Sequence, residues 1–204
     1  MPRLNLAQFV TDFADALKVV DTQGPIGRST TRTYQPGVGP LQEREAVRLV
    51  AAQLAMSPAY SGIGPSRYPG LAQECDLVIP GEWAIEIKLA RPFGDNGKPA
   101  EHWSENLVHP YPGNTSAVGD ALKLRAMSGQ LAKAVIVFGF EHKDAITALE
   151  PAIRAFELVA AEVAGVALGP RHEAVRTDLI HPAHQVLRVY GWEVLPVTKG
   201  VSTP

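Results

Sequence analysis

Residues 74–91, ECDLVIPGEWAIEIKLAR, decide how the rest of the chain is interpreted. Two apolar runs on either side of a Pro-Gly pair are typical of two strands joined by a turn. The second run carries Glu86 and Lys88 where a buried strand normally has only aliphatic residues. Because an unpaired charge is costly to bury, these two residues need an explanation in the fold or in the chemistry of the protein.

The length of the turn determines which side chains meet. Side chains alternate across a strand, so Glu86 and Lys88 share one face. A two-residue turn at Pro80-Gly81 would place Asp76 on the other face, whereas a three-residue connection over residues 80–82 would pair Asp76 with Glu86. A Pro-Gly type II turn splays a tight hairpin, so we expect the longer connection and one shared face for all three charged residues.

This combination of charged residues suits metal-assisted hydrolysis. Two carboxylates on a partly buried face repel each other and lose hydration, and a divalent cation such as Mg²⁺ or Mn²⁺ offsets both costs. A lysine on the same face can orient or deprotonate an attacking water and balance the charge of a phosphate. Asp76, Glu86 and Lys88 therefore predict hydrolysis of a phosphodiester. The alternative interpretation is an exposed polar face with an ordinary ion pair.

Asp76, nine intervening residues and then Glu86-Ile87-Lys88 resemble the motif of the PD-(D/E)XK nuclease superfamily, the restriction-endonuclease-like fold. The resemblance covers residues 41–140, and Cys75 stands where the family has the proline that gives the motif its name. We interpret Cys75 as a buried small hydrophobic residue. The resemblance implies a central mixed sheet flanked by helices, a divalent metal between Asp76 and Glu86, and Lys88 near the nucleophilic water.

Many members of this superfamily also have a glutamate on the first core helix that reaches the metal. Glu43 and Glu45 are the candidates in the helix predicted over residues 41–56. At about 100° per residue, Glu43 falls on the apolar stripe of this helix and Glu45 points away from it, so Glu43 is the better candidate ligand. A first-turn glutamate favoured by the helix dipole is an equally good interpretation of Glu43.

The segment over residues 91–114 is long for a connection inside a compact domain, and such loops are commonly functional or disordered. It mixes positive charge with aromatic surface, which suits contact with phosphates and unstacked bases. The candidate contacts are Arg91, Lys98, His102, Trp103, His109 and Tyr111, of which we predict Arg91, Lys98 and Trp103 as substrate-binding residues. A lid or an interface is the alternative role of this segment.

Two further pairs of polar residues follow. Asp120 and Lys123 share a face of the helix predicted over residues 115–127, where Asn114 or Thr115 is the expected N-cap. We expect a solvent-facing ion pair, and we include Lys123 among the substrate contacts because it can reach a phosphate. His181 and His184 have a spacing seen in metal sites, but no third ligand is evident, so we interpret them as structural or surface histidines.

The order of elements predicts the α/β class, a central mixed β-sheet flanked by helices. A helix occupies the first twenty residues, a Gly- and Pro-rich linker follows over residues 22–40, and a short edge strand is expected within residues 59–72. A buried strand at residues 134–140, a helix at 151–165 and strands or a short helix after residue 172 complete the pattern. We predict one domain over residues 1–204, with the nuclease-like core at 41–140 between an N-terminal helix with linker and a C-terminal extension.

Composition limits the possible partners. The chain has 204 residues, 46% of them hydrophobic, and a net charge of −2, so nucleic acid must be held by a local basic patch or by metal ions. One cysteine, the lack of an apolar run of about 20 residues and an N-terminus unlike a secretory signal predict a cytoplasmic protein without a membrane span.

Together these features predict a Mg²⁺- or Mn²⁺-dependent deoxyribonuclease. Asp76 and Glu86 would hold the metal, Glu43 would add to its shell, and Lys88 would assist the attacking water. We expect DNA as the substrate, with RNA left open, and action as a homodimer or with a partner protein because no separate DNA-binding motif is evident. The resemblance suggests restriction, defence or repair. The alternative is an inactive nuclease-fold module that binds nucleic acid or another protein.

Overall fold

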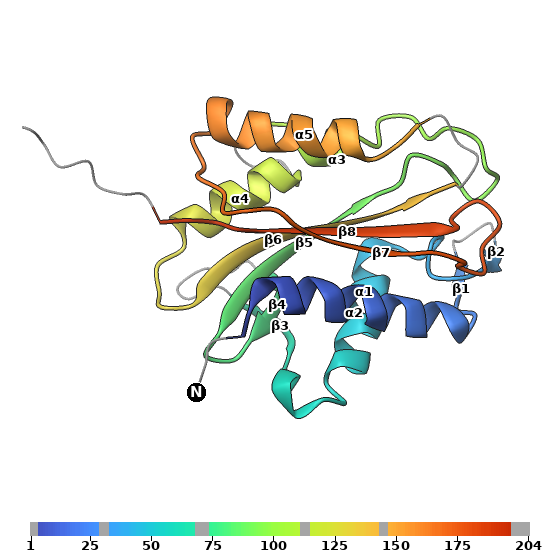
Figure 1. Ribbon diagram of the computed structural model, residues 1–204, viewed down its shortest axis with the longest axis horizontal. Coiled ribbons are helices and arrows are strands. Elements are labelled where there is room, and N and C mark those ends of the chain that lie inside the picture. The colour runs from blue at the N-terminus through green and yellow to red at the C-terminus, as the bar shows by residue number, and fades with distance from the viewer. Residues whose placement is uncertain (1–3, 29–32, 68–73, 111–114, 143–146, 197–204) are drawn as a thin grey trace, which may run out of the picture.

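The computed structural model of the chain describes residues 4–28, 33–67, 74–110, 115–142 and 147–196. Its centre is a six-stranded sheet with helices on both faces (Figure 1). In spatial order the strands are β3 (Gly64–Arg67), β4 (Glu74–Ile79), β5 (Trp83–Ala90), β6 (Ala132–Glu141), β8 (Val186–Glu193) and β7 (His172–Arg176). Strands β5 and β6 are parallel and the other neighbouring pairs are antiparallel, which confirms the predicted α/β class with a central mixed sheet.

The predicted helices occur in the predicted order, and one short additional helix lies in the segment 91–114 that was expected to be a loop. The helices are α1 (Leu6–Thr22), α2 (Glu43–Leu54), α3 (Glu105–Val108), α4 (Ala117–Ala126) and α5 (Glu150–Leu158), with a 3₁₀ turn at Pro58–Tyr60 and a π-helical turn at Val159–Val163 that continues α5. The predicted linker contains a two-stranded sheet of β1 (Ile26–Arg28) and β2 (Thr33–Pro36), which its Gly- and Pro-rich composition did not indicate. Within the described residues, no helix has both the length and the apolar character that a bilayer crossing requires.

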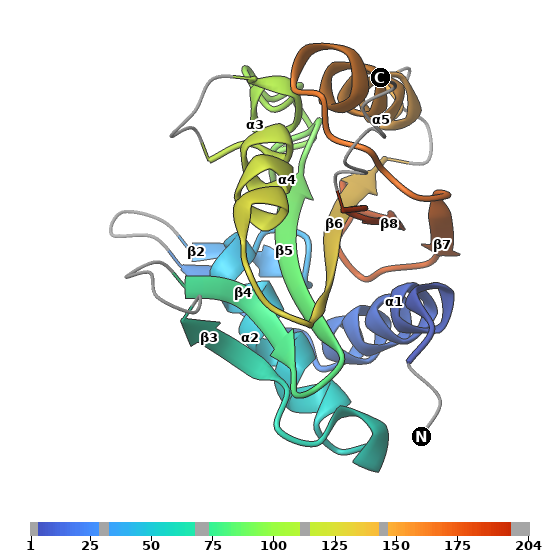
Figure 2. The same cartoon turned by 90° about the vertical axis from the view of Figure 1, so that its left-hand side faces the viewer.

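The sheet separates two apolar cores. Helices α1 and α2 cover one face, and α3, α4 and α5 cover the other (Figures 1 and 2). Ile85 and Ile87 of β5 belong to the first core, whereas Ala84 and Ala90 belong to the second. Strict alternation along β5 therefore turns the side chain of Glu86 toward α4. Every residue of β5 is buried, because strands flank it on both sides and helices cover both faces.

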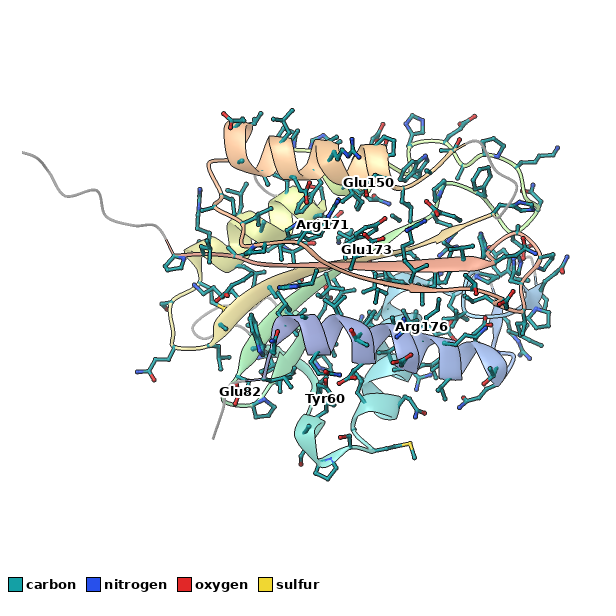
Figure 3. All side chains as sticks on the ribbon, in the orientation of Figure 1. Tyr60, Glu82, Glu150, Arg171, Glu173 and Arg176 are labelled. Carbon is teal, nitrogen blue, oxygen red and sulfur yellow. The ribbon has the colours of Figure 1, made fainter. Side chains whose placement is uncertain are left out.

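Ion pairs join the sheet to helices on both faces (Figure 3). Arg176 of β7 donates from Nε to Oδ1 of Asp15 on α1 over 2.6 Å. On the opposite face, Arg171, which immediately precedes β7, donates from Nη1 to Oε1 of Glu150 on α5 over 3.1 Å. These pairs are partly exposed, and such pairs contribute little stability. The edge strand is therefore held mainly by its packing against α1 and its pairing with β8.

The turn between β4 and β5 has the predicted length. Leu77 pairs with Ile85 and Ile79 with Trp83, which leaves residues 80–82 as the connection. The Glu82 N–H donates to the Ile79 carbonyl over 3.0 Å, and Gly81 has a φ of 76°, as the third position of a type II turn requires. The predicted odd-length connection is therefore confirmed. The pairing of β4 with β5 ends at Leu77 and Ile85, and the next residue, Asp76, accepts the Ile87 N–H through its side chain.

The positive φ of Gly81 gives the first prediction. Gly81→Ala should lower the free energy of unfolding by about 1 kcal/mol, because an alanine at this φ is strained. No atom lies within 4 Å of the added methyl group, so the cost comes from the backbone alone. Gly64→Ala is the matched control, since Gly64 also has open space around it but lies in a strand without a positive φ. Urea unfolding measures both, and equal stability of the two variants would contradict the prediction.

His181 and His184 connect two loops in the interior. Both side chains are buried, and their rings stack with centroids 4.4 Å apart. His181 Nε2 lies 2.9 Å from Oδ1 of Asp95, and His184 Nε2 lies 2.8 Å from the carbonyl oxygen of Phe93. The pair therefore joins the segment before β8 to the loop after β5, which makes it structural. Burial lowers the pKa of His184 to about 4, although its hydrogen bond to Phe93 opposes the shift.

The stability of the protein should therefore fall as the pH drops from 6.5 toward 4. In this range His184 of the unfolded protein, with its ordinary pKa of 6.5, takes up a proton. In the folded protein, His184 stays mostly neutral until the pH approaches its lowered pKa of about 4. The difference between the two pKa values corresponds to about 3 kcal/mol. Urea unfolding across this range should show a shallower pH dependence for His184→Gln than for the wild type. His102→Gln, at an exposed histidine, is the control and should keep the wild-type slope. Equal slopes in all three proteins would contradict the prediction.

Candidate functional site

A cavity of about 640 Å³ lies beside β5, between α2, α4 and the loop that follows β5. It is lined by Glu43, Glu74, Asp76, Glu86, Lys88, Leu89, Arg91, Gly94, Ala100, Glu101, Trp103, Asn106, Thr115, Asp120 and Lys123. Every residue that we predicted as catalytic or metal-binding lines this cavity, as do three of the four predicted substrate contacts. The exception is Lys98, which is exposed and lies outside the lining.

Two of the cavity carboxylates are held by the main chain of β5. Oδ2 of Asp76 accepts the Ile87 N–H over 2.8 Å, and Oε2 of Glu43 accepts the Leu89 N–H over 2.6 Å. These bonds fix both carboxylates and leave the second oxygen of each available for other contacts. Glu43 thus reaches the site from α2, as its place on the apolar stripe predicts, whereas Glu45 is exposed.

Lys88 lies between carboxylates from two different helices. Its Nζ is 3.0 Å from Oδ2 of Asp120 on α4 and 3.6 Å from Oε1 of Glu43 on α2. Burial by itself would lower the pKa of Lys88, but the attraction of Asp120 and Glu43 outweighs it, so the pKa is raised. Lys88 is therefore held as an ammonium group. In this arrangement it can donate hydrogen bonds and balance negative charge, but it is not a proton acceptor.

Asp120 and Lys123 differ from the predicted solvent-facing pair. Asp120 is only 2% exposed, because the face of α4 that carries it packs toward β5. Lys123 Nζ lies 2.5 Å from Oδ1 of Asp120 and 4.0 Å from Oε1 of Glu86. Burial by itself would lower the pKa of Lys123, but its hydrogen bond and charge attraction to Asp120 raise it. The expected solvent-facing ion pair is therefore wrong for Asp120, which belongs to the interior of the site.

The N-cap of α4 also differs from the prediction. It is Ser116, not Asn114 or Thr115, and its hydroxyl accepts the Gly119 N–H over 3.1 Å. The same hydroxyl donates to the carbonyl oxygen of His109 over 2.5 Å. The first turn of α4 is thereby attached to the loop after β5. Asn114 itself lies outside the described residues.

The loop after β5 contributes fewer free cationic groups than predicted. The guanidinium of Arg91 donates to the carbonyl oxygens of Leu41 and Pro40, over 2.6 and 3.5 Å, and so joins the end of β5 to the start of α2. Trp103 is half-buried and packs partly on the core beneath α4. His102 lies 2.6 Å from Glu105 in an exposed pair. Tyr111 lies outside the described residues. Among the predicted contacts of this loop that the structure describes, Trp103 is the aromatic residue that lines the cavity.

The charge of the cavity favours a cation. Its lining contains six carboxylates against three cationic groups, a formal charge of −3. Carboxylate oxygens are ligands for hard cations such as Mg²⁺, which often binds through one or two carboxylates and completes its shell with waters and phosphate oxygens. The pair of Asp76 and Glu86 fits such a site. Within the described residues, however, no three His, Cys, Asp or Glu side chains are arranged to hold one metal ion. Glu43 and Asp120 are turned toward lysines instead.

Several lining residues were missed by the sequence reasoning. Glu74 precedes Asp76 by two residues, so strand alternation was a sufficient signal to place both on one face. Glu101 and Asn106 lie in the long loop, where no periodicity indicates the direction of a side chain. Asp120 was recognised as a helical residue, but its burial depends on how α4 packs against β5.

The site is defined by its geometry, because comparison with known proteins adds no relative. Comparison of the chain with protein-family models, with curated proteins and with solved structures finds no match in any of the three. The structure brings Asp76, Glu86, Lys88 and Glu43 into one cavity, with Lys123 beside Glu86. It is this convergence of carboxylates and lysines on a buried strand that any functional assignment must explain.

Proposed function

We propose that the protein is a divalent-cation-dependent deoxyribonuclease of the PD-(D/E)XK type. The observation that carries the proposal is that Asp76, Glu86 and Lys88 line one cavity. The three-residue turn between β4 and β5 is consistent with this convergence. The cavity is large enough for part of a nucleic-acid strand. Surface ion pairs do not require such a cavity or the burial of the strand that bears the charges.

A Mg²⁺ or Mn²⁺ ion is the cofactor that this donor set fits. Asp76 and Glu86 would hold it, and the N–H of Ile87 orients the Asp76 carboxylate. Glu43 would join the metal shell through Oε1, which now faces Lys88 at 3.6 Å. When bound, such an ion lowers the pKa of a coordinated water and balances the charge of the phosphate.

The remaining residues have roles that follow from their charge. Lys88 is an ammonium group, so it would donate a hydrogen bond to the attacking water or to a phosphate oxygen and would not remove a proton. Lys123 is the second cationic group, and its partly exposed Nζ beside Glu86 would contact the phosphate. Trp103 would stack against a base next to the scissile bond. Arg91 supports the site through its bonds to the start of α2.

The first test is cleavage of supercoiled plasmid and of linear DNA in the presence of Mn²⁺. Lys88→Met should reduce the rate by about 10²- to 10⁴-fold, the range lost with a group that assists proton transfer or charge balance. The exposed Glu45→Gln is the matched surface variant and should keep the wild-type rate. Equal cleavage by the wild type and Lys88→Met would show that another site or a contaminant cleaves the DNA. DNA binding without any cleavage would favour an inactive binding module.

The second test is the affinity for Mn²⁺ itself, measured by calorimetry without DNA. Asp76→Asn should weaken binding by about tenfold or more, since it replaces a charged ligand by an amide. Glu43→Gln should weaken it less, because Oε1 of Glu43 is also engaged by Lys88. Glu45→Gln on the same helix should bind as the wild type does. If Asp76→Asn and Glu45→Gln bound Mn²⁺ equally well, the assigned metal ligands would be wrong.

A further inference from the structure

Asp120 is a buried charge that the proposed reaction does not use directly. Its two oxygens face two different lysines, with Oδ1 2.5 Å from Lys123 Nζ and Oδ2 3.0 Å from Lys88 Nζ. Both lysines line the cavity, and Asp120 is their common partner. The carboxylate is thus placed between the two cationic groups of the proposed site.

We propose that Asp120 is a positioning residue that holds Lys88 and Lys123 in place for the reaction. The proposal rests on the nuclease function proposed above, because the position of Lys88 matters to a rate only if Lys88 takes part. Asp120 contributes no ligand to the cation and does not touch the phosphate. It acts through the lysines by fixing where their ammonium groups lie.

Lys88 needs such a partner because its side chain is flexible. A lysine carries its charge on a four-carbon stem that loses rotamer freedom when it is ordered. Glu43 approaches the Lys88 ammonium from α2 at 3.6 Å, but that carboxylate would turn to a bound cation. Asp120 approaches from α4 at the shorter distance of 3.0 Å and has no such competing role. With a cation present, Asp120 is therefore the carboxylate that keeps Lys88 in place.

The two lysines also need Asp120 in order to remain close together. Both ammonium groups converge on one buried carboxylate, and like charges in a poorly solvated site repel each other strongly. Without the negative charge, at least one lysine must turn away from the cavity. Asp120 itself is well fixed, because its N–H donates to the carbonyl of Ser116 over 2.8 Å in the first turn of α4. Sites built on rigid elements hold such geometry best.

A purely structural role is the alternative explanation. An acidic residue in the first turn of a helix stabilises the helix through its dipole, and Asp120 occupies this turn of α4. A structural role predicts that Asp120→Asn lowers stability but leaves the lysines and the chemical step of the folded protein unchanged. Asp21→Asn is the matched control, because Asp21 is also buried but, among the described residues, its carboxylate accepts the N–H groups of Val38 and Ile180.

The first experiment measures how accessible Lys88 is in the protein without metal or DNA. Brief acetylation with acetic anhydride in EDTA, followed by mass spectrometry of peptides, gives the labelling rate of each lysine, with exposed Lys98 as the internal standard. Lys88 is protected in the wild type, where its side chain is 11% exposed. In Asp120→Asn, Lys88 should be acetylated several-fold faster than in the wild type. In Asp21→Asn, Lys88 should be acetylated at the wild-type rate. An unchanged rate in Asp120→Asn overturns the proposal.

The second experiment separates the chemical step from binding. With Mn²⁺, Asp120→Asn should lower kcat by about 10- to 100-fold, as loss of a supporting residue does. Its affinity for a short oligonucleotide in EDTA should be unchanged or tighter, because the cavity has lost a negative charge. In the Lys88→Met background, Asp120→Asn should cause a smaller further loss, because only the position of Lys123 is then affected. An unchanged kcat, or the same loss in both backgrounds, overturns the proposal.

These outcomes are distinct from a failure of the proposed function. If the wild type cleaves DNA and Asp120→Asn cleaves equally fast, the nuclease function stands and the positioning role of Asp120 fails. If the wild type does not cleave DNA, the nuclease function fails, and the catalytic part of this inference fails with it. The labelling rates then still show whether Asp120 protects the Lys88 amine. Asp21→Asn, assayed below its melting temperature, should lose stability and keep its kcat.

Discussion

Compensation of the charges on β5 is the constraint on which the rest of the structure depends. Glu86 and Lys88 lie in a strand that is buried throughout, and an uncompensated buried charge costs several kcal/mol. Lys88 is compensated by carboxylates from α2 and α4, which lie on opposite sides of the sheet. These two helices must therefore begin near the same point of β5, because Glu43 and Asp120 lie in their first turns. The placement of the helices around the cavity follows from this requirement.

The same carboxylates replace part of the strand pairing. Asp76 and Glu43 accept the main-chain N–H groups of Ile87 and Leu89, in the part of β5 that lies beyond its pairing with β4. A cavity can open there because side chains satisfy the donors of the central strand. Replacing a buried ionic cluster by apolar residues is often neutral or stabilising in other proteins. Stability alone therefore does not explain the cluster, whereas a function that needs charge at this point does.

The parts of the site that lie on regular strands and helices were predictable from the periodicity of the sequence. The period of two in β5 and the odd length of the turn were enough to place Asp76 with Glu86, and helical periodicity was enough to select Glu43 over Glu45. Asp120 was not placed correctly, because an acid and a lysine three residues apart are typical of a helix surface. Arg91 was expected to contact substrate, but its carbonyl partners lie about fifty residues earlier in the chain. Such long-range contacts leave no local pattern.

The charge of the cavity sets the order in which its ligands would bind. A formal charge of −3 repels a phosphate, and Lys88 is already engaged by Asp120 and Glu43. A divalent cation, if bound as proposed, would reverse part of this field, because it would neutralise two carboxylate charges and draw Glu43 away from Lys88. Each ligand then favours the other, and by linkage the gain in affinity is equal in both directions. The proposed nuclease would thus bind nucleic acid productively only with its cation in place. A cavity that was lined mainly by lysines and arginines would bind phosphate without a metal and would lack this coupling.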